Sequence, residues 1–294
     1  MISVDVKDLS PQETYFYLIA GIAPRPIALV STVNKEGKNN LAPFSFFNAF
    51  GANPPMIGFS PARRSTDGTQ KDTYNNIMET KECVVQVVNY DLVEKISLSS
   101  TEYAPGIDEF IKGGMTPIDS DIVKAKRVKE SPFQMECKLH QMVNLGDKGG
   151  AGNLAICEVL KFHISEDVMK DGRINPYLID LVGRNAGSFY TRANNDALFE
   201  IKKPIGKQCM GYDQLPDYLL NSELLTGKNL AMLAHAETIP EALSIEDFKK
   251  ELSKTNYASS NTLTKESLEK TIQAALSAND LDFAWKAAVM IREL

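Results

Sequence analysis

The chain has few of the residues that hold metals or form disulfides, with four cysteines and three histidines among 294 residues. The cysteines form no Cys-x-x-Cys pair, and the histidines form no HExxH motif. Both absences argue against a zinc site, and we expect no bound metal. Cys83, Cys137 and Cys157 stand in apolar, strand-like surroundings, which predicts that they are small buried residues of a core. A reducing cytoplasm is therefore the expected location.

Long hydrophobic runs and an excess of positive charge are also missing. No stretch approaches the ~20 apolar residues of a membrane helix, and residues 1–8 lack the basic flank and apolar run of a signal peptide. The net charge of −6 argues against a dedicated nucleic-acid binder, which usually has a basic face. We expect no membrane and no nucleic acid as partners.

Three enzyme signatures are absent as well. There is no GxSxG elbow for a serine nucleophile and no Walker sequence for a nucleoside triphosphate. The glycine-rich stretch 146–153 is followed by a strand-like segment at 154–165, whereas a dinucleotide fingerprint opens a helix. We interpret this stretch as a hairpin connection.

The first two thirds of the chain predicts a mainly β domain with inserted helices. Residues 11–21 have the pattern of a short helix capped by Ser10, and a second helix is expected from Asp72 or Thr73, either of which could cap it, to Glu79. Apolar or β-branched runs predict the strands. These strands are expected at about 27–32, 40–47, 56–60, 83–89, 133–144 and 154–165.

The pattern changes near residue 198. Residues 241–254, 264–278 and 281–294 have apolar positions at helical spacing, and strand signals nearly vanish. We therefore expect two parts, a β-rich domain over 1–198 and a mostly helical extension over 199–294.

Polar and aromatic side chains alternate near the end of the second predicted strand. Phe44, Phe46 and Phe47 surround Ser45 and precede Asn48. One interpretation is that the aromatic rings fill a barrel whose mouth the polar residues cover. The other is that the strand edge lies along a flat heterocycle, with backbone groups and Ser45 meeting its polar rim.

A second polar segment, residues 60–73, supplies three cations and several hydroxyl groups directly before a predicted helix. A phosphate gains charge-assisted hydrogen bonds from Arg or Lys, and the free N–H groups of a helix start favour an anion. A solvated surface loop is the alternative interpretation.

Seven short motifs occur in the order found in flavin reductase-like proteins, which the chain resembles over about residues 10–200. They are RPIALVST at 25–32, APFSFFN at 42–48, PPMIGFS at 54–60, KDT at 71–73, ECKL at 136–139, GNLAICEV at 152–159 and GRNAGSFY at 183–190. The chain is similar to the longer branch of that family, which continues beyond the barrel.

The resemblance implies a split β-barrel, a homodimer and bound FMN near the subunit interface. It implies that Phe44 to Asn48 line the flavin ring, partly through backbone groups, and that Arg184 and Tyr190 close the site. The phosphate would be held by Ser60, Arg63, Lys71 and Thr73, with Asp72 ordering that corner. The residues so expected are Phe44, Ser45, Phe46, Phe47, Asn48, Ser60, Arg63, Lys71, Asp72, Thr73, Arg184 and Tyr190.

One departure from the family bears on the electron donor. Small reductases of this kind carry Gly-Asp-His before the strand that ends in Glu-Val, and here Lys148 follows Gly146 and Asp147. Our hypothesis is an FMN-dependent oxidoreductase of flavin reductase or flavoredoxin type, reduced by NAD(P)H or by a protein donor. A non-enzymatic protein that stores or senses FMN is the alternative, and a split barrel holding heme or another ligand is a third. Flavin chemistry resides in the cofactor, so no side chain is named as catalytic.

Overall fold

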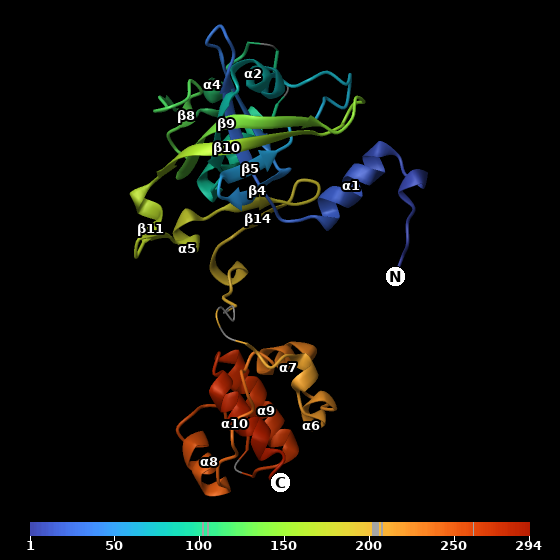
Figure 1. The fold of residues 1–294 in the computed structure, drawn as a ribbon, viewed down its shortest axis with the longest axis vertical. Helices are drawn as coiled ribbons and strands as arrows, with labels where there is room; N and C mark the ends of the chain where they lie inside the picture. Colours follow the sequence, from blue (N-terminus) through green and yellow to red (C-terminus); the bar gives the residue numbers. More distant parts are fainter. Residues whose placement is uncertain (102, 105, 202–205, 207, 261) are drawn as a thin grey trace. The chain divides into compact units, whose positions relative to one another are not determined.

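The computed structural model describes residues 1–294 except 102, 105, 202–205, 207 and 261. The chain divides into two compact units, Met1–Phe199 and Glu200–Leu294, which we describe separately (Figure 1). Within the described residues no helix combines the length and apolar character that a membrane crossing requires.

The first unit is built around one seven-stranded sheet in which every neighbouring pair of strands is antiparallel. The strand order is β3-β2-β6-β9-β10-β5-β4. The strands are β2 (Ala28–Val33), β3 (Asn39–Phe44), β4 (Phe47–Ala52), β5 (Pro55–Phe59), β6 (Glu82–Val87), β9 (Phe133–Asn144) and β10 (Asn153–Ile164). The predicted mainly β character is confirmed.

The two edge strands of this sheet, β3 and β4, are consecutive in the chain and are separated only by Ser45 and Phe46. The sheet must therefore curl until its two edges approach each other at this bend. The backbone N–H of Ser60, directly after β5, donates to the carbonyl of Phe46 at 2.9 Å and fixes the bend. The result is a barrel that is open along one seam.

The prediction of one strand over 40–47 is wrong, because the strand stops at Phe44 and the chain turns at Ser45 and Phe46 before β4 begins. β4 was missed altogether. It contains no β-branched residue, and five of its six residues are exposed, so no alternating pattern marks it in the sequence.

The barrel interior is filled by apolar side chains of the main sheet, with Phe59 and Val85 fully buried. Cys83, Cys137 and Cys157 belong to this core, as the sequence predicted. Contact with Cys137 and burial raise the pKa of the Cys83 thiol well above its usual range. A buried, protonated thiol is a poor nucleophile and metal ligand, so these cysteines contribute packing.

Helices flank the barrel. α1 (Pro11–Gly21) begins at Ser10, whose hydroxyl accepts from the Glu13 N–H in a capping box, so this predicted cap is confirmed. α2 (Asp72–Thr80) begins one residue after Lys71, which makes no side-chain cap hydrogen bond, so the predicted cap at Asp72 or Thr73 is wrong. α3 (Val93–Ser99) and α4 (Glu109–Gly113) pack near β3, where Phe110 is fully buried.

A second, three-stranded sheet has the order β1-β13-β14. Its strands are β1 (Arg25–Pro26), β13 (Val182–Arg184) and β14 (Tyr190–Arg192). The remaining elements of this unit are β7 (Pro117–Ile118), β8 (Arg127–Val128), β11 (Met169–Lys170), β12 (Arg173–Ile174), α5 (Pro176–Ile179), η1 (Val6–Asp8), η2 (Tyr90–Leu92), η3 (Glu166–Val168) and η4 (Asn195–Ala197).

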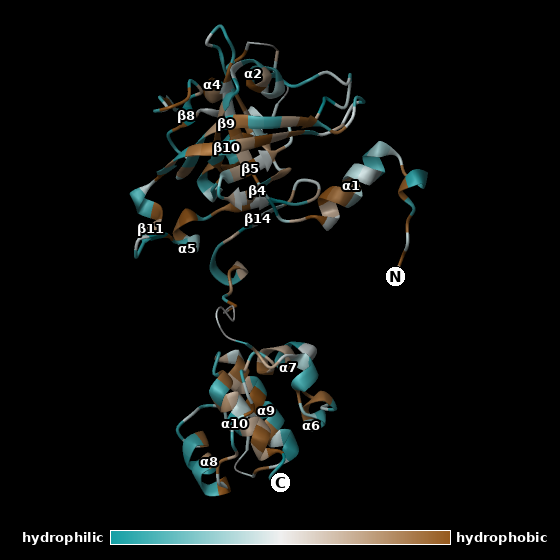
Figure 2. Cartoon of the chain, in the orientation of Figure 1, coloured by the Kyte–Doolittle hydropathy of each residue, from teal (hydrophilic) through white to brown (hydrophobic). Residues whose placement is uncertain are grey.

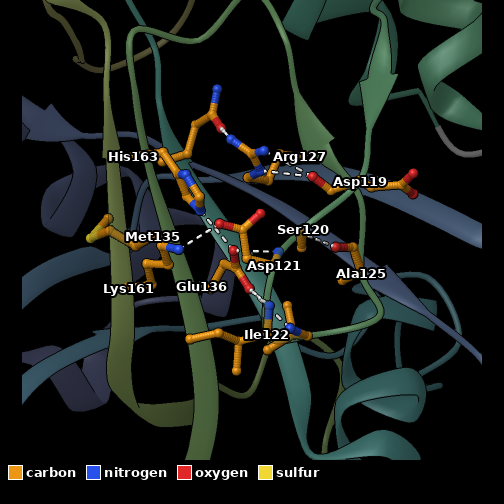
Figure 3. A network of polar contacts seen from close by, with 12 residues as sticks. Asp119, Ser120, Asp121, Ile122, Ala125, Arg127, Met135, Glu136, Lys161 and His163 are labelled. Atoms are coloured by element: carbon orange, nitrogen blue, oxygen red, sulfur yellow. Dashed lines mark hydrogen bonds and ion pairs between the residues drawn. The ribbon is translucent and has the colours of Figure 1, made fainter.

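Glu136 of β9 binds the 119–127 segment to the main sheet through hydrogen bonds (Figure 3). Its fully buried carboxylate accepts from the backbone N–H groups of Asp121 (2.8 Å), Ile122 (2.6 Å) and Val123 (2.9 Å), and its Oε1 lies 2.7 Å from His163 Nε2. Asp121, Glu136 and His163 are close enough to share a cation. However, Glu136 is already hydrogen-bonded on both oxygens and Lys161 pairs with Asp121, so the cluster works as a structural clamp.

The second unit is entirely helical apart from its loops, within the described residues, as predicted for the extension. Its central Trp285 is 2% exposed and donates its indole N–H to the Leu233 carbonyl at 2.9 Å. The hydroxyl of Thr264 caps α9 by accepting from the Ser267 N–H. The helices are η5 (Tyr212–Gln214), α6 (Asp217–Leu220), α7 (Gly227–Leu233), α8 (Ile245–Leu252), α9 (Lys265–Ser277) and α10 (Leu281–Met290).

Candidate functional site

Three buried polar atoms without a hydrogen-bond partner lie on two short segments that meet at the end of β5. They are Ser60 Oγ, Arg63 Nε and Asn153 Oδ1, and among the described residues only one other buried side-chain atom is in this state. Asn153 Nδ2 donates to the Pro61 carbonyl at 2.9 Å, which ties the two segments together. Buried polar groups in folded proteins are nearly always paired, so this corner points to a polar ligand or to bound water.

The backbone holds this corner rigidly. The N–H of Arg63 donates to the Ala151 carbonyl at 2.9 Å, and the N–H of Gly150 donates back to the Arg63 carbonyl at 3.2 Å. Gly152 has no side chain where a Cβ would stand 3.2 Å from Ser60 Oγ. The glycine-rich connection 146–153 is the loop of the β9–β10 hairpin, and it forms one wall of the corner.

A pocket of about 110 Å³ opens beside this corner, at the start of α2. The predicted residues Lys71, Asp72 and Thr73 line it together with Arg64. Arg64 Nη2 lies 3.5 Å from Asp72 Oδ2, so the acidic residue positions this guanidinium. The pocket is smaller than the roughly 300–1,000 Å³ of sites that bury a whole drug-sized ligand, and it suits one end of a ligand.

The pocket also has a wall that sequence reasoning did not find. Its members come from β3, from the end of α3 and from the segment leading to α4, which only the fold brings together. They are Asn40, Ser99, Ser100, Thr101, Tyr103 and Glu109. Burial raises the pKa of Glu109, whose carboxylate accepts from the Leu41 N–H at 3.0 Å.

Thr73 lines the pocket but is almost fully buried. It is 1% exposed, and its hydroxyl accepts from Asn40 Nδ2 at 2.9 Å. The same amide donates to Thr32 at 3.2 Å, so Thr73 belongs to a small internal network that fixes the first turn of α2. Its hydroxyl hydrogen remains available to donate.

The aromatic residues expected along a flat ligand are divided between two faces of the seam. Phe44 is 6% exposed, packs on Phe59 with ring centroids 5.7 Å apart, and has Lys71 Nζ 5.6 Å from its own centroid. Phe46 is 40% exposed, and Phe47 is half-buried at the start of β4. The Phe44 ring therefore lies in the barrel interior, and the Phe46 ring lies outside.

The remaining predicted residues lie at the two ends of the seam. Asn48 is exposed, and its Oδ1 accepts from the Ala49 N–H at 2.9 Å. Ser45 lies 3.4 Å from Arg25 Nε, and Arg25 pairs in register with Arg184 of β13. Sequence reasoning missed Arg25, although it stands within the first family motif.

Arg184 and Tyr190 lie together, with the guanidinium carbon 4.5 Å from the ring centroid. Arg184 also donates to the Gly187 carbonyl at 2.6 Å. Tyr190, however, lines a different pocket of about 230 Å³ with Tyr90 and Arg192. In the part of the chain that the structure describes, this pair is linked to Ser45 through the register of Arg184 with Arg25.

A family model described as the flavin reductase like domain matches residues 20–180. The chain belongs to the flavin reductase-like family. The matched residues lie within the first unit and include every expected site residue except Arg184 and Tyr190.

Individual relatives agree with this assignment. An uncharacterized protein of Halalkalibacterium halodurans is 40% identical over 191 residues, 64% of this chain and 91% of that one. The crystal structure of nitrilotriacetate monooxygenase component B from Bacillus cereus is 34% identical, with a TM-score of 0.64 over 68% of this chain and 98% of that chain. A Shewanella frigidimarina structure with a split barrel domain has a TM-score of 0.57 at 24% identity, covering 67% of this chain and 96% of that one. The split-barrel fold is confirmed.

Proposed function

We propose that this flavin reductase-like protein binds FMN at the seam of its barrel and works as an FMN-dependent oxidoreductase. The observation that carries the proposal is the pair of buried, unpartnered donors Ser60 Oγ and Arg63 Nε, next in the chain to the pocket that Arg64 and Lys71 line. A phosphate accepts from several donors at once and gains most from charged ones, so it satisfies both atoms.

The residues of this corner have distinct roles in the proposal. Ser60 and Arg63 donate to the phosphate, and Lys71 adds charge from the residue before α2. The first N–H groups of α2 lie next to Lys71, which makes no side-chain cap hydrogen bond. Asp72 orders Arg64 on the pocket wall, and Thr73 holds the first turn of the helix in place.

The ring of the cofactor would lie along the seam from Phe44 to Asn48. Phe44 and Phe47 exclude water from the barrel side, and the exposed Phe46 covers the other face. Ser45 and the backbone of the bend meet the polar rim, and Arg184 with Tyr190 closes the far end. When bound, FMN supplies the acceptance and onward transfer of electrons, and the protein positions it and sets its surroundings.

NAD(P)H or a protein donor would supply the electrons. Lys148 stands in the β9–β10 loop where small reductases carry a histidine. This substitution favours a second candidate function, an FMN-binding protein that stores or senses the cofactor without reducing it. In either case no side chain of the seam needs to act as an acid or base.

Anaerobic mixing of the FMN-loaded protein with NADH, and separately with NADPH, distinguishes the two candidates. We expect the flavin absorbance band to bleach with one of the two nucleotides and to return when air is admitted. A band that stays unchanged while FMN remains bound would favour the storage or sensing protein. A protein that is colourless and does not quench added FMN fluorescence would contradict both.

We also propose that the protein is a homodimer joined through α1 and β4. α1 projects from the side of the barrel (Figure 1), and Figure 2 shows apolar residues along it. Only Ile19 of this helix is buried, whereas Phe16 is 56% exposed. Phe50 of the edge strand β4 is 67% exposed. Large exposed apolar side chains are typical of an interface between subunits.

A further inference from the structure

Arg25 is a buried cation whose hydrogen-bond acceptors are all uncharged. The residue is 5% exposed. Its Nη1 donates to the carbonyls of Ile19 (2.7 Å) and Ile22 (2.6 Å), and Nη2 donates to the carbonyl of Asn185 (3.3 Å). Its Nε donates to Ser45 Oγ at 3.4 Å. Buried charges in proteins are normally paired with an opposite charge, and no carboxylate of the described residues forms an ion pair with this one.

The surroundings compensate this charge only in part. Ile19 lies in the last turn of α1 and Ile22 directly follows the helix, so the negative end of the helix dipole, about −0.5 elementary charge, faces the guanidinium. No basic residue of α1 itself stands in that turn. Arg184 adds a second positive charge at the paired position of β13. Burial lowers the pKa of Arg25, Tyr15 opposes this and Arg184 adds to it, but a guanidinium stays protonated at neutral pH.

This partly compensated charge lies at the barrel seam. Arg25 contacts Ser45 in the bend between β3 and β4, and its guanidinium carbon is 5.9 Å from the centroid of the Phe46 ring. Asn40 lies on the wall of the pocket that Arg64 and Lys71 line, five residues before Ser45. Five extended residues span roughly 16 Å. A ligand whose phosphate lies in the pocket region and whose ring follows this segment reaches the guanidinium with its ring.

We propose that Arg25 favours the reduced, anionic form of the ring over the oxidised, neutral form, so that the protein binds reduced FMN more tightly than oxidised FMN. This inference rests on the proposed function, because it takes FMN as the ligand of the seam. Two electrons and one proton convert oxidised FMN into the reduced anion, and dithionite supplies the electrons in the test below. A positive charge held in a poorly solvated place acts strongly on a new negative charge nearby.

The test measures the midpoint potential of protein-bound FMN against that of free FMN under anaerobic conditions, using dithionite and a reference dye. The difference gives the ratio of the affinities for the reduced and oxidised forms. For Arg25→Gln we expect this ratio to fall about tenfold, equal to about 30 mV for a two-electron couple. Arg25→Lys, which keeps the charge, retains most of the preference.

Two further variants separate charge from structure. Asn185→Asp places a carboxylate on the residue whose carbonyl Arg25 contacts and leaves Arg25 in place, so it lowers the ratio even if Arg25→Gln does not fold. Ser10→Ala removes the capping box of α1 without altering any charge near the seam, and the ratio stays at its wild-type value. A ratio that is unchanged in the folded, FMN-loaded Asn185→Asp and Arg25→Gln proteins would overturn the inference. A wild-type protein that binds neither form of FMN would overturn the proposed function instead.

Discussion

The backbone N–H of Ser60 donates to the carbonyl of Phe46 across 2.9 Å, and this bond joins the end of β5 to the bend at which the barrel opens. It places the hydroxyl of Ser60, which has no partner, close to the two residues that separate the edge strands. The corner at Ser60 and the bend at Ser45 and Phe46 are therefore adjacent.

The carboxylate of Glu136 makes the barrel sensitive to acid. Burial alone would raise its pKa. Hydrogen bonds from the Asp121 N–H, from His163 and from the Val123 and Ile122 N–H groups outweigh this effect, and the pKa falls from 4.5 to about 2. A folded-state pKa below the unfolded value gives stability that is complete above about pH 4.5 and is lost as the pH falls toward 2. At neutral pH we expect Glu136→Gln to lower the free energy of unfolding by about 3 kcal/mol.

Urea unfolding at a series of pH values, followed by circular dichroism, checks this. The difference in unfolding free energy between wild type and Glu136→Gln should shrink as the pH falls from 5 to 3. Glu36→Gln, in an exposed turn, is the matched control. A difference that stays constant with pH, or that is equal for the control, would show that the clamp has been misread.

The two compact units are proposed to unfold as separate domains. Trp285 is the single tryptophan of the chain and is buried in the helical unit, so its fluorescence reports that unit alone. Release of FMN reports the barrel. We expect Phe248→Ala, in the helical core, to destabilise the fluorescence transition by about 3–5 kcal/mol and to leave FMN release unchanged.

Leu29→Ala, in the barrel, is the matched variant. It should destabilise the transition followed by FMN release by about 2–5 kcal/mol and leave the fluorescence transition unchanged. If either substitution moved both transitions equally, the units would form one cooperative domain, and the boundary proposed near residue 198 would be wrong.

An element of this fold can be predicted from the sequence when the residues that stabilise it lie within the element itself. The sequence predicts α1 together with its cap, because Ser10 satisfies an N–H group within the first turn of its own helix. The spacing of apolar residues alone predicts α9. β9 was predicted over its full length because twelve residues of a long strand give a repeated pattern. β4 could not be predicted, because its pairing with β5 and not its own composition makes it a strand.

The candidate site likewise contains residues that the sequence predicts and residues that only the fold brings together. Lys71 and Asp72 could be placed at one corner because they are neighbours in a motif. The pocket wall formed by Ser99, Tyr103 and Glu109 comes from a part of the chain with no such motif, and only the packing of α3 and α4 on β3 brings it there. Arg25 gave no signal of its burial, since an arginine between two prolines is ordinarily read as a turn on the surface.

The proposed dimer predicts that apolar residues exposed on α1 are needed for association. Replacing Phe16 by aspartate should raise the dissociation constant of the dimer at least tenfold, or about 1.4 kcal/mol, while leaving monomer stability nearly unchanged because the side chain is exposed. Light scattering after gel filtration at several concentrations measures this. Ile111→Asp on α4, where Ile111 is 79% exposed, is the matched control and should not change the mass. A monomeric wild-type protein would contradict the dimer.

The proposed function depends on phosphate binding by Ser60, Arg63 and Lys71. Comparing FMN with riboflavin isolates this binding, because riboflavin has the same ring and no phosphate. We expect Arg63→Ala to weaken FMN binding by about 1.5–3 kcal/mol, which is the cost of losing one charge-assisted hydrogen bond. Riboflavin binding should stay at its wild-type value, and Arg173→Ala, an exposed arginine of β12, should affect neither ligand. Fluorescence-quenching titrations give all of these constants. A selective loss of FMN affinity in Arg63→Ala would support a phosphate held by Ser60, Arg63 and Lys71. An equal loss for FMN and riboflavin would show that the phosphate lies elsewhere.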